Sequence, residues 1–133
     1  MEREHKYKFW SKIEKRFLTD YDLRFTGINI AFTLPDIVPI QYTGLKDKNG
    51  KEIYEGDIVD CEFQQVVSNF HYETQRIVEW DNNECEFYFY YMNGERQGGG
   101  YTFCKNNMNK LYEIIGNIFE NPELLGDIIW LTR

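Results

Sequence analysis

Alanine is nearly absent from this 133-residue sequence, which has a single one, at position 31. Long helical bundles and coiled coils are rich in Ala, Leu, Glu and Lys, so the composition argues strongly against that class. No stretch of about eighteen consecutive apolar residues exists either, and we therefore expect no membrane-spanning helix.

Cysteine and histidine are also scarce, with three cysteines (Cys61, Cys85 and Cys104) and two histidines (His5 and His71). An odd number of widely spaced cysteines does not make a disulfide framework, and zinc sites prefer paired ligands two to four residues apart. We expect the three thiols to be reduced and buried as small apolar groups in strands. The first residues lack the apolar segment of a signal peptide, so the cytoplasm is the expected compartment.

Aromatic residues are what the sequence has in excess: ten Phe, ten Tyr and three Trp. Five Val, thirteen Ile and seven Thr raise the β-branched and aromatic share to about a third, and such side chains pack well on a pleated surface. With 42% hydrophobic residues the chain can form a core, which excludes intrinsic disorder. The expected fold class is mainly β, either all-β or α+β with very little helix, in a single domain over residues 1–133.

The charge is acidic overall, with a formal net value of −7. A protein that binds nucleic acid non-specifically gains affinity from Lys and Arg side chains that release counterions, so this balance disfavours a nucleic-acid partner. Residues 1–24 differ, because they carry seven basic and five acidic groups, whereas the remainder carries eight and seventeen. A small basic patch near the N-terminus is one interpretation of this asymmetry, and a mixed solvated surface is the other.

Local patterns place the strands. The alternation of Val59, Cys61 and Phe63 with Asp60 and Glu62 predicts a half-buried antiparallel strand. Strands are expected at 5–10, 17–21, 23–32 (interrupted by Gly27), 40–45, 51–54, 58–63, 76–80, 86–92, 101–104 and 113–119. The other expectations are a loop or edge at 33–39, a long loop at 64–75, a short helix at 106–112 and a helical turn at 121–125 with Pro122 at its start.

Two turn signals dominate the middle of the chain: Lys46-Asp47-Lys48-Asn49-Gly50 and Glu55-Gly56-Asp57. Asn and Gly tolerate positive φ, so the first cluster favours a tight reversal between flanking strands. In the second turn, Asp57 is expected to accept hydrogen bonds from backbone amides. The two turns together predict a three-stranded meander over about residues 40–63. Gly116, inside a predicted strand, is expected at a bulge or a close backbone approach.

Two longer segments are more specific than these signals. They are Gln41-Tyr42-Thr43-Gly44-Leu45-Lys46-Asp47-Lys48-Asn49-Gly50-Lys51-Glu52-Ile53-Tyr54-Glu55-Gly56-Asp57-Ile58-Val59 and Glu113-Ile114-Ile115-Gly116-Asn117-Ile118-Phe119-Glu120-Asn121-Pro122-Glu123-Leu124-Leu125. Together they resemble the signature of the YopX family, small proteins encoded by bacteriophages and prophages. The opening Lys6-Tyr7-Lys8-Phe9-Trp10-Ser11 is loosely similar to that family's Lys-Phe-Arg-Ala-Trp-Asp strand.

The resemblance extends from Lys6 to Leu125. It implies an antiparallel, barrel-like folded sheet with a distant likeness to small five-stranded barrels of the OB and SH3 type. It also implies that the protein acts in the cytoplasm of a bacterial host. The resemblance supplies no catalytic residue and no cofactor.

No catalytic, cofactor-binding or metal-binding residue is assigned from the sequence. The sequence has no G-x-S-x-G nucleophile motif, and the stretch at 97–100 lacks the Lys-Ser/Thr pair of a phosphate-binding loop. Two interpretations of the first family-like segment stay open. Its residues serve turn geometry, or they form a ligand loop composed of Tyr42, Thr43, Asp57, Lys46, Lys48 and Lys51.

The predicted strand at 86–92 carries aromatic residues on both of its faces. A strand with two apolar faces is either central in its sheet or covered by a partner. The second alternative is in keeping with the enrichment of Tyr and Trp at protein interfaces. The candidate interaction surface consists of Tyr88, Tyr90, Tyr91, Tyr42 and Tyr54.

Three hypotheses about function follow. The first is a non-enzymatic phage or prophage accessory protein that acts by protein contact, with itself as a homo-oligomer and with a phage or host protein. The alternative is a barrel that binds single-stranded nucleic acid by stacking bases on exposed rings. The third is an enzyme whose site is assembled from residues distant in the sequence.

Overall fold

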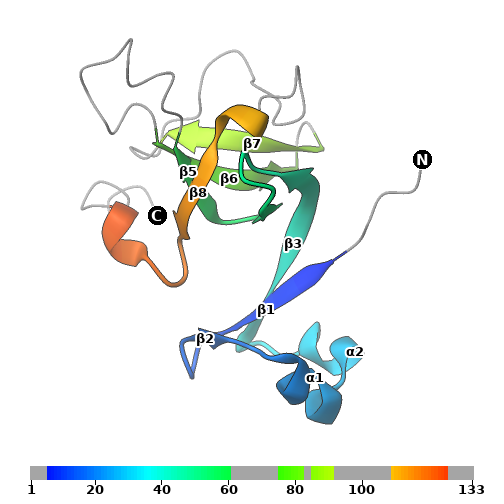
Figure 1. Ribbon diagram of the computed structural model, residues 1–133. Helices are drawn as coiled ribbons and strands as arrows, with labels where there is room; N and C mark the ends of the chain where they lie inside the picture. Colours follow the sequence, from blue (N-terminus) through cyan, green and yellow to red (C-terminus); the bar gives the residue numbers. More distant parts are fainter. Residues whose placement is uncertain (1–5, 61–74, 83–84, 92–108, 126–133) are drawn as a thin grey trace.

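The computed structural model describes residues 6–60, 75–82, 85–91 and 109–125, and within them most secondary structure is antiparallel sheet (Figure 1). One four-stranded sheet has the order β2 (Arg16–Phe17), β1 (Tyr7–Ser11), β3 (Ile37–Lys46), β4 (Glu52–Tyr54). The other has the order β7 (Glu86–Tyr91), β6 (Gln75–Asp81), β5 (Asp57–Asp60), β8 (Glu113–Asn117). The helical elements within the described residues are α1 (Asp20–Thr26), α2 (Ile28–Ala31), a short 3₁₀-helix at 109–111 and the 3₁₀-helix η3 (Pro122–Leu125).

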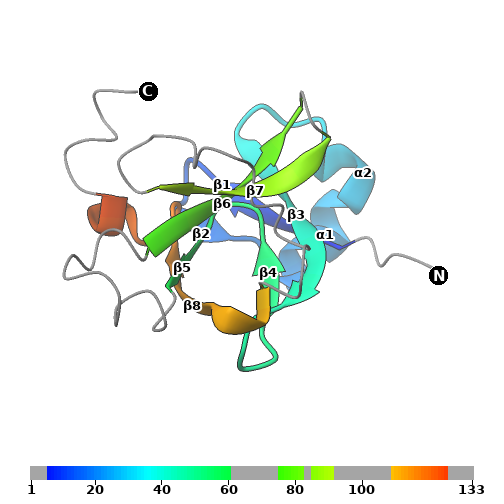
Figure 2. The ribbon, with the colours of Figure 1, turned by 90° about the horizontal axis from the view of Figure 1, so that it is seen from above.

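One of the sheets is curled into a half-barrel, as the view from above shows (Figure 2). The mainly β fold class and the antiparallel, barrel-like sheet expected from the sequence are therefore confirmed. The single domain over residues 1–133 stays a prediction.

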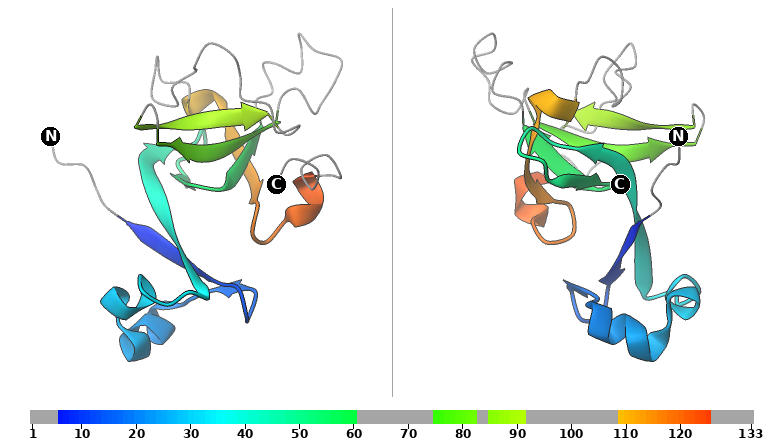
Figure 3. Two further views of the ribbon diagram at one scale, coloured as in Figure 1. Left: turned by 180° about the vertical axis from the view of Figure 1, so that it is seen from behind. Right: turned by 45° about the vertical axis from the view of Figure 1, so that its right-hand side comes forward.

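Strand β3 joins the two ends of the molecule. Its first half pairs with β1 and its second half pairs with β4. The pairing with β4 is irregular between Tyr42 and Lys46, where Gly44 takes a φ of +87°. We call residues 7–41 the arm and the described residues from 42 onward the body. Figures 1 and 3 show α1 and α2 at the far end of the arm, away from β6 and β7.

The strand predicted at 23–32 is wrong, because this segment forms α1 and α2. Helix α1 begins with a reciprocal cap. The Thr19 hydroxyl accepts a hydrogen bond from the Asp22 N–H (3.2 Å), and the Asp22 carboxylate accepts one from the Thr19 N–H (2.7 Å). Such a capping box satisfies two backbone donors at the helix start, and Gly27, at a φ of +82°, ends the helix. These local contacts outweigh the strand propensity of the Ile and Phe residues.

The predicted three-stranded meander is also wrong, because β4 and β5 lie in different sheets. The turn between them is held from both sides. The Glu55 N–H donates to the Gln41 carbonyl (2.9 Å), and the Gly56 N–H donates to the Val78 carbonyl of β6 (2.6 Å). Gly56 has a φ of +87°, and a Cβ there would lie 2.7 Å from the Phe119 ring. Only glycine fits this crossover without strain.

Other local predictions are confirmed. Gly116 lies where the pairing of β8 with β5 shifts, and a Cβ there would lie 2.7 Å from the Asn121 side-chain oxygen. The helical turn at 121–125 is present as η3, and residues 109–111 form a short 3₁₀-helix inside the predicted range 106–112. The predicted strand at 101–104 and the predicted loop at 64–75 lie outside the described residues, except for Gln75 at the start of β6.

In the part of the chain that the structure describes, the core consists of three clusters of buried residues. The first lies in the body: Ile53, Val59, Val78, Phe87 and Tyr112. The second joins arm to body through Trp10, Ile40, Tyr42 and Tyr54, with Phe119 packed against them, and the third is formed by Ile58 and Ile77.

The three cysteines were expected to be buried in strands. Cys85 is instead exposed, in the turn between β6 and β7, at a φ of +55°. The turn takes this residue out of the strand, so the prediction is wrong for Cys85. Cys61 and Cys104 lie outside the described residues.

Candidate functional site

The tyrosines of the candidate interaction surface separate into two groups. The backbones of Tyr88, Tyr90 and Tyr91 lie on β7, the outermost of the described strands of its sheet, where they pair with Glu79, Ile77 and Arg76 of β6. The side chains of these three tyrosines lie outside the description, so their part in an interaction surface stays a prediction.

Tyr42 and Tyr54 lie in the core and not on an exposed surface. They are 3% and 6% exposed, and their ring centroids are 5.3 Å apart. The Lys8 ammonium lies 4.3 Å from the centroid of the Tyr54 ring, a distance at which a cation is attracted to the ring face. Burial raises the pKa of the Tyr54 phenol. Both rings therefore help to hold arm and body together.

Exposed apolar side chains gather instead on the arm. The largest exposure, 76%, belongs to Phe25, whose ring lies 4.8 Å from that of Tyr21 on the same face of α1. The Phe32 ring packs edge-on against Tyr7 at 4.9 Å. We call the exposed apolar residues at and beside the two helices the apolar tip: Tyr7, Tyr21, Phe25, Ile28, Ile30, Phe32 and Leu34.

The apolar tip was not predicted, because Phe25, Ile28, Ile30 and Phe32 fall in the strand expected at 23–32 and the other members in the expected strands and loop beside it. Two signals were available. Thr19 and Asp22 have the spacing of a capping box, and Tyr21 and Phe25 have the spacing of neighbours on a helix.

Basic and acidic groups are equal in number toward the far end of the arm. Arg16 contacts the Asp22 carboxylate at 2.7 Å, and this hydrogen bond, with those from Thr19, holds the pKa of Asp22 well below its usual range. Residues 12–36 contain four basic groups and four acidic groups. The far end of the arm is therefore close to neutral in a chain whose net charge is −7.

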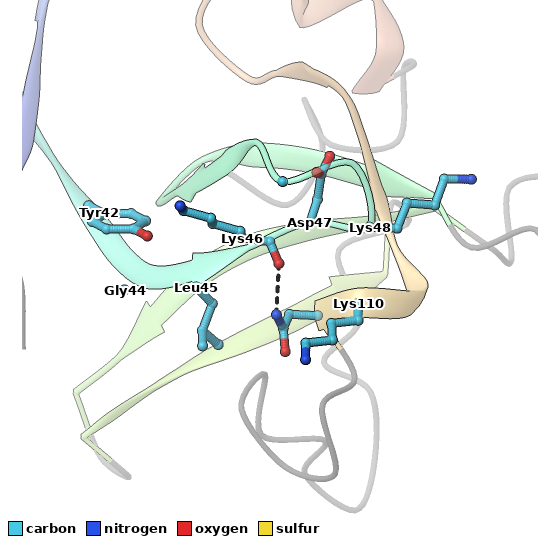
Figure 4. Close-up of a pocket in the computed structure, with 9 residues that line it drawn as sticks. Tyr42, Gly44, Leu45, Lys46, Asp47, Lys48 and Lys110 are labelled. Carbon is cyan, nitrogen blue, oxygen red and sulfur yellow. Dashed lines mark hydrogen bonds between the residues drawn. The ribbon is translucent and has the colours of Figure 1, made fainter.

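A second feature is a hollow of about 510 Å³ where the turn after β3 meets residues 109–110 (Figure 4). We call it the basic hollow. It is lined by Tyr42, Gly44, Leu45, Lys46, Asp47, Lys48, Gly50, Asn109 and Lys110. The Asn109 side-chain N–H donates to the Lys46 carbonyl (2.7 Å), the bond drawn dashed in Figure 4, and the Lys48 N–H donates to the Tyr112 carbonyl (2.9 Å). Segments more than sixty residues apart are thus fastened together at this point.

Asp47 anchors the wall of the hollow. Its buried carboxylate accepts hydrogen bonds from the N–H groups of Asn49 (2.9 Å), Lys51 (2.9 Å) and Ile114 (3.0 Å). The first two bonds fix the turn, and the third fixes the turn to β8. Because these bonds occupy the carboxylate, its chemistry here is structural.

The ligand loop considered from the sequence is only partly assembled. Tyr42, Lys46 and Lys48 line the hollow. The remaining members, Thr43, Asp57 and Lys51, do not line it. The Thr43 hydroxyl donates to the Ile53 carbonyl at 2.8 Å, which is a structural contact.

Asp57 is a buried acid at the crossover between the sheets. As predicted, it accepts a hydrogen bond from a backbone amide, the Tyr54 N–H, at 2.7 Å. Burial raises the pKa of Asp57 to about 6 against the lowering effect of this bond. A cavity of about 330 Å³ lies beside the crossover, lined in part by Glu55, Glu79 and Trp80. Burial also raises the pKa of Glu55, with a smaller effect from the charge of Glu79.

In the described part of the chain, no three side chains of His, Cys, Asp or Glu come together in a way that could hold a metal ion. None of the helices within the described ranges has both the length and the apolar character needed to cross a membrane. His5 and His71 lie outside those ranges.

Comparison with known proteins gives one family. The fold is similar to the crystal structure of protein EF1440 from Enterococcus faecalis, with a TM-score of 0.57, 23% identity, and coverage of 93% of this chain and 99% of that one. No match was found among curated proteins. The family described as YopX protein matches residues 3–126. Because this match spans nearly the whole chain, the protein belongs to the YopX family.

Proposed function

We propose that this protein is a non-enzymatic interaction module, a phage or prophage accessory protein that acts in the cytoplasm of a bacterial host by contact with other proteins. We further propose that the apolar tip is the contact surface and that its first partner is a second copy of the chain. A phage or host protein then binds the assembled form. The observation that carries the proposal is the exposure of seven large apolar residues at one end of the arm.

The exposed area is large enough for a stable contact. The exposed fractions of the apolar tip amount to nearly four fully exposed large residues, which is on the order of 560–750 Å² at roughly 150–200 Å² each. A standard interface buries about 800 Å² per partner, of which roughly 60% is apolar. The tip therefore offers the apolar area that one side of such an interface needs.

The charge distribution favours a second copy at this place. Two chains with a net charge of −7 repel each other over most of their surface. Residues 12–36 carry equal numbers of basic and acidic groups, so two arms can approach with little repulsion. A two-fold contact also needs only one kind of surface, since the same patch serves on both subunits.

The chain offers a matched test. Replacement of Phe25 by Asp places a charge at the centre of the proposed contact, whereas replacement of Leu111 by Asp charges a 47% exposed apolar residue on the body. We expect the wild type to show a concentration-dependent mass above 16.1 kDa in sedimentation equilibrium. Phe25→Asp should be monomeric with an unchanged circular dichroism spectrum, and Leu111→Asp should behave as the wild type. If the wild type stays monomeric at a protein concentration about 100 times a micromolar dissociation constant, the proposed self-association is overturned.

The nucleic-acid alternative has less support from the described residues. Base stacking needs exposed rings inside a basic groove. The exposed rings of the arm lie on a segment with balanced charge, while Tyr42 and Tyr54 are buried. On the arm, exposed aromatic rings are therefore not accompanied by an excess of positive charge.

A further inference from the structure

We propose that the basic hollow binds a phosphorylated small molecule of nucleotide size. The site is distinct from the apolar tip and does not depend on self-association. Its volume of about 510 Å³ falls within the roughly 300–1,000 Å³ of ordinary small-molecule sites.

The walls of the hollow are held in place without a ligand. Asp47 binds both the turn and β8, and the side chain of Asn109 is bonded to the Lys46 carbonyl. The hollow is thus formed by two fastened segments and not by one loose loop. A preformed site of this kind loses little conformational entropy on binding.

The positive charge of the hollow is only partly compensated by nearby acids, because three lysines line it against the single lining carboxylate of Asp47. The carboxylate of Asp47 is occupied by backbone amides, and Lys48 lies 3.7 Å from Glu113. In the ranges that the structure describes, neither Lys46 nor Lys110 forms an ion pair. In Figure 4 Lys46 extends toward Tyr42, whereas Lys48 points the opposite way. Lys46 and Lys110 are therefore the two ammonium groups available to an anion.

The hollow also holds a buried polar group with bonding capacity to spare. Asn109 is only 5% exposed, yet its side chain makes a single hydrogen bond, through its N–H to the Lys46 carbonyl. Its amide oxygen has no partner within the described residues. Buried amide oxygens are nearly always hydrogen-bonded, so this atom is suited to accept a bond from a ligand hydroxyl or amino group.

These features select the class of ligand. Two ammonium groups favour a phosphoryl group, the half-buried Leu45 in the wall favours an apolar body, and Asn109 favours a donor on that body. A nucleotide combines all three. A long nucleic-acid strand shares this chemistry but must approach a protein with a net charge of −7, which favours the small molecule.

The test is an amide NMR titration of the full chain with adenosine 5′-triphosphate, inorganic phosphate and a single-stranded oligonucleotide of about ten nucleotides. We expect saturable shifts at Lys46, Gly50 and Asn109 with the nucleotide. The variants Lys46→Gln and Lys110→Gln should each weaken binding about ten-fold, because each removes one charge-assisted contact. The matched control, Lys12→Gln, removes an exposed lysine of the arm and should leave the affinity unchanged.

Three results would overturn the proposal: no saturable shift with the nucleotide, equal binding of inorganic phosphate, or the same affinity in the two lysine variants. If the oligonucleotide bound more tightly than the nucleotide and with a strong dependence on salt, the ligand of the hollow would be a nucleic-acid strand and not a small molecule. The titration is repeated with Phe25→Asp, so that a failure of the proposed self-association cannot be mistaken for a failure of this site.

Discussion

The arm and the body place the same residue types in opposite environments. Ile53 of the body is fully buried, whereas Ile30 of the arm is 54% exposed. Phe87 lies in the core of the body, while Phe25 projects from α1. Two helices of seven and four residues have too few neighbours to build a core. An apolar side chain is therefore structural in the body and available to a partner in the arm.

The acids of the two regions differ in the same way. Asp22 on the arm is paired with Arg16, which lowers its pKa, whereas burial raises the pKa of Asp57 at the crossover. Solvent and a cation stabilise the charged form in the first case, and the loss of solvent destabilises it in the second.

The largest expected effect comes from truncating matched isoleucines. Ile53→Ala should lower the free energy of unfolding by about 2–5 kcal/mol, because it leaves a cavity in the main core cluster. Ile30→Ala should change it by less than about 0.5 kcal/mol. Urea denaturation at a protein concentration low enough for monomers measures both values, and equal losses would contradict the contrast between body and arm.

The next effect concerns glycines with the same backbone conformation. Gly56→Ala should cost about 3 kcal/mol, because a φ of +87° is combined with a Cβ position 2.7 Å from the Phe119 ring. Gly50→Ala, at a φ of +81° with nothing within 4 Å, should cost only about 1 kcal/mol. Thermal unfolding of the two variants compares these costs. A smaller loss for Gly56→Ala would show that the crossover can rearrange.

Asp57 should make the free energy of unfolding fall as the pH rises from about 4 to about 6. The ordinary pKa of an aspartate is 3.8 and that of Asp57 in the folded protein is about 6, so the folded state binds the proton more tightly than the unfolded chain. Stability from this group is complete below about pH 4 and is lost as the pH rises to about 6, a change of roughly 2–3 kcal/mol. Asp57→Asn should remove this part of the slope in denaturation measured from pH 4 to 7, and leave the part of the same sign that comes from Glu55.

Asp22 on the arm serves as a control, because its contribution to stability changes with pH in the opposite direction. Because the pKa of Asp22 is lowered, its contribution is present at neutral pH and is lost as the pH falls. Asp22→Asn should therefore leave the slope between pH 4 and 7 intact. If Asp57→Asn also left it intact, burial at the crossover would not be its cause.

The smallest expected effect is at the helix cap. Thr19→Ala removes the hydroxyl that accepts from the Asp22 N–H, and should cost about 1 kcal/mol and speed amide exchange in α1. Thr33→Ala removes an exposed hydroxyl that donates to the Ile30 carbonyl and should cost only a few tenths. Hydrogen exchange confined to the arm would distinguish local fraying from loss of the whole fold.

Local chemistry explains which predictions were confirmed. The turn at 46–50 is fixed by Asp47, whose carboxylate binds amides two and four residues ahead. Gly116 and Pro122 likewise act on their immediate neighbours. The helix at 20–26 was not predicted, although its cap is also local. The strand propensity of its side chains points one way, and the spacing of Thr19 and Asp22 points the other.

The candidate site was less predictable than the turns. Alternation along a strand shows that Tyr42 and Tyr54 share a face, but not that the face is closed by Trp10 and Phe119. The basic hollow needs Lys46 and Lys110 to line the same space, and no local pattern connects residues so far apart.

The sequence alone determined the β-rich class, the sharp turns and the family, because these depend on composition and on contacts within a few residues. Only the tertiary structure decided which apolar side chains are buried and which sheet each strand joins after the turn at Gly56. It also decided that Lys46 and Lys110 line one hollow together with the buried Asn109. Burial and charge compensation are set by neighbours in space. The same isoleucine or lysine therefore takes its role from the packing around it.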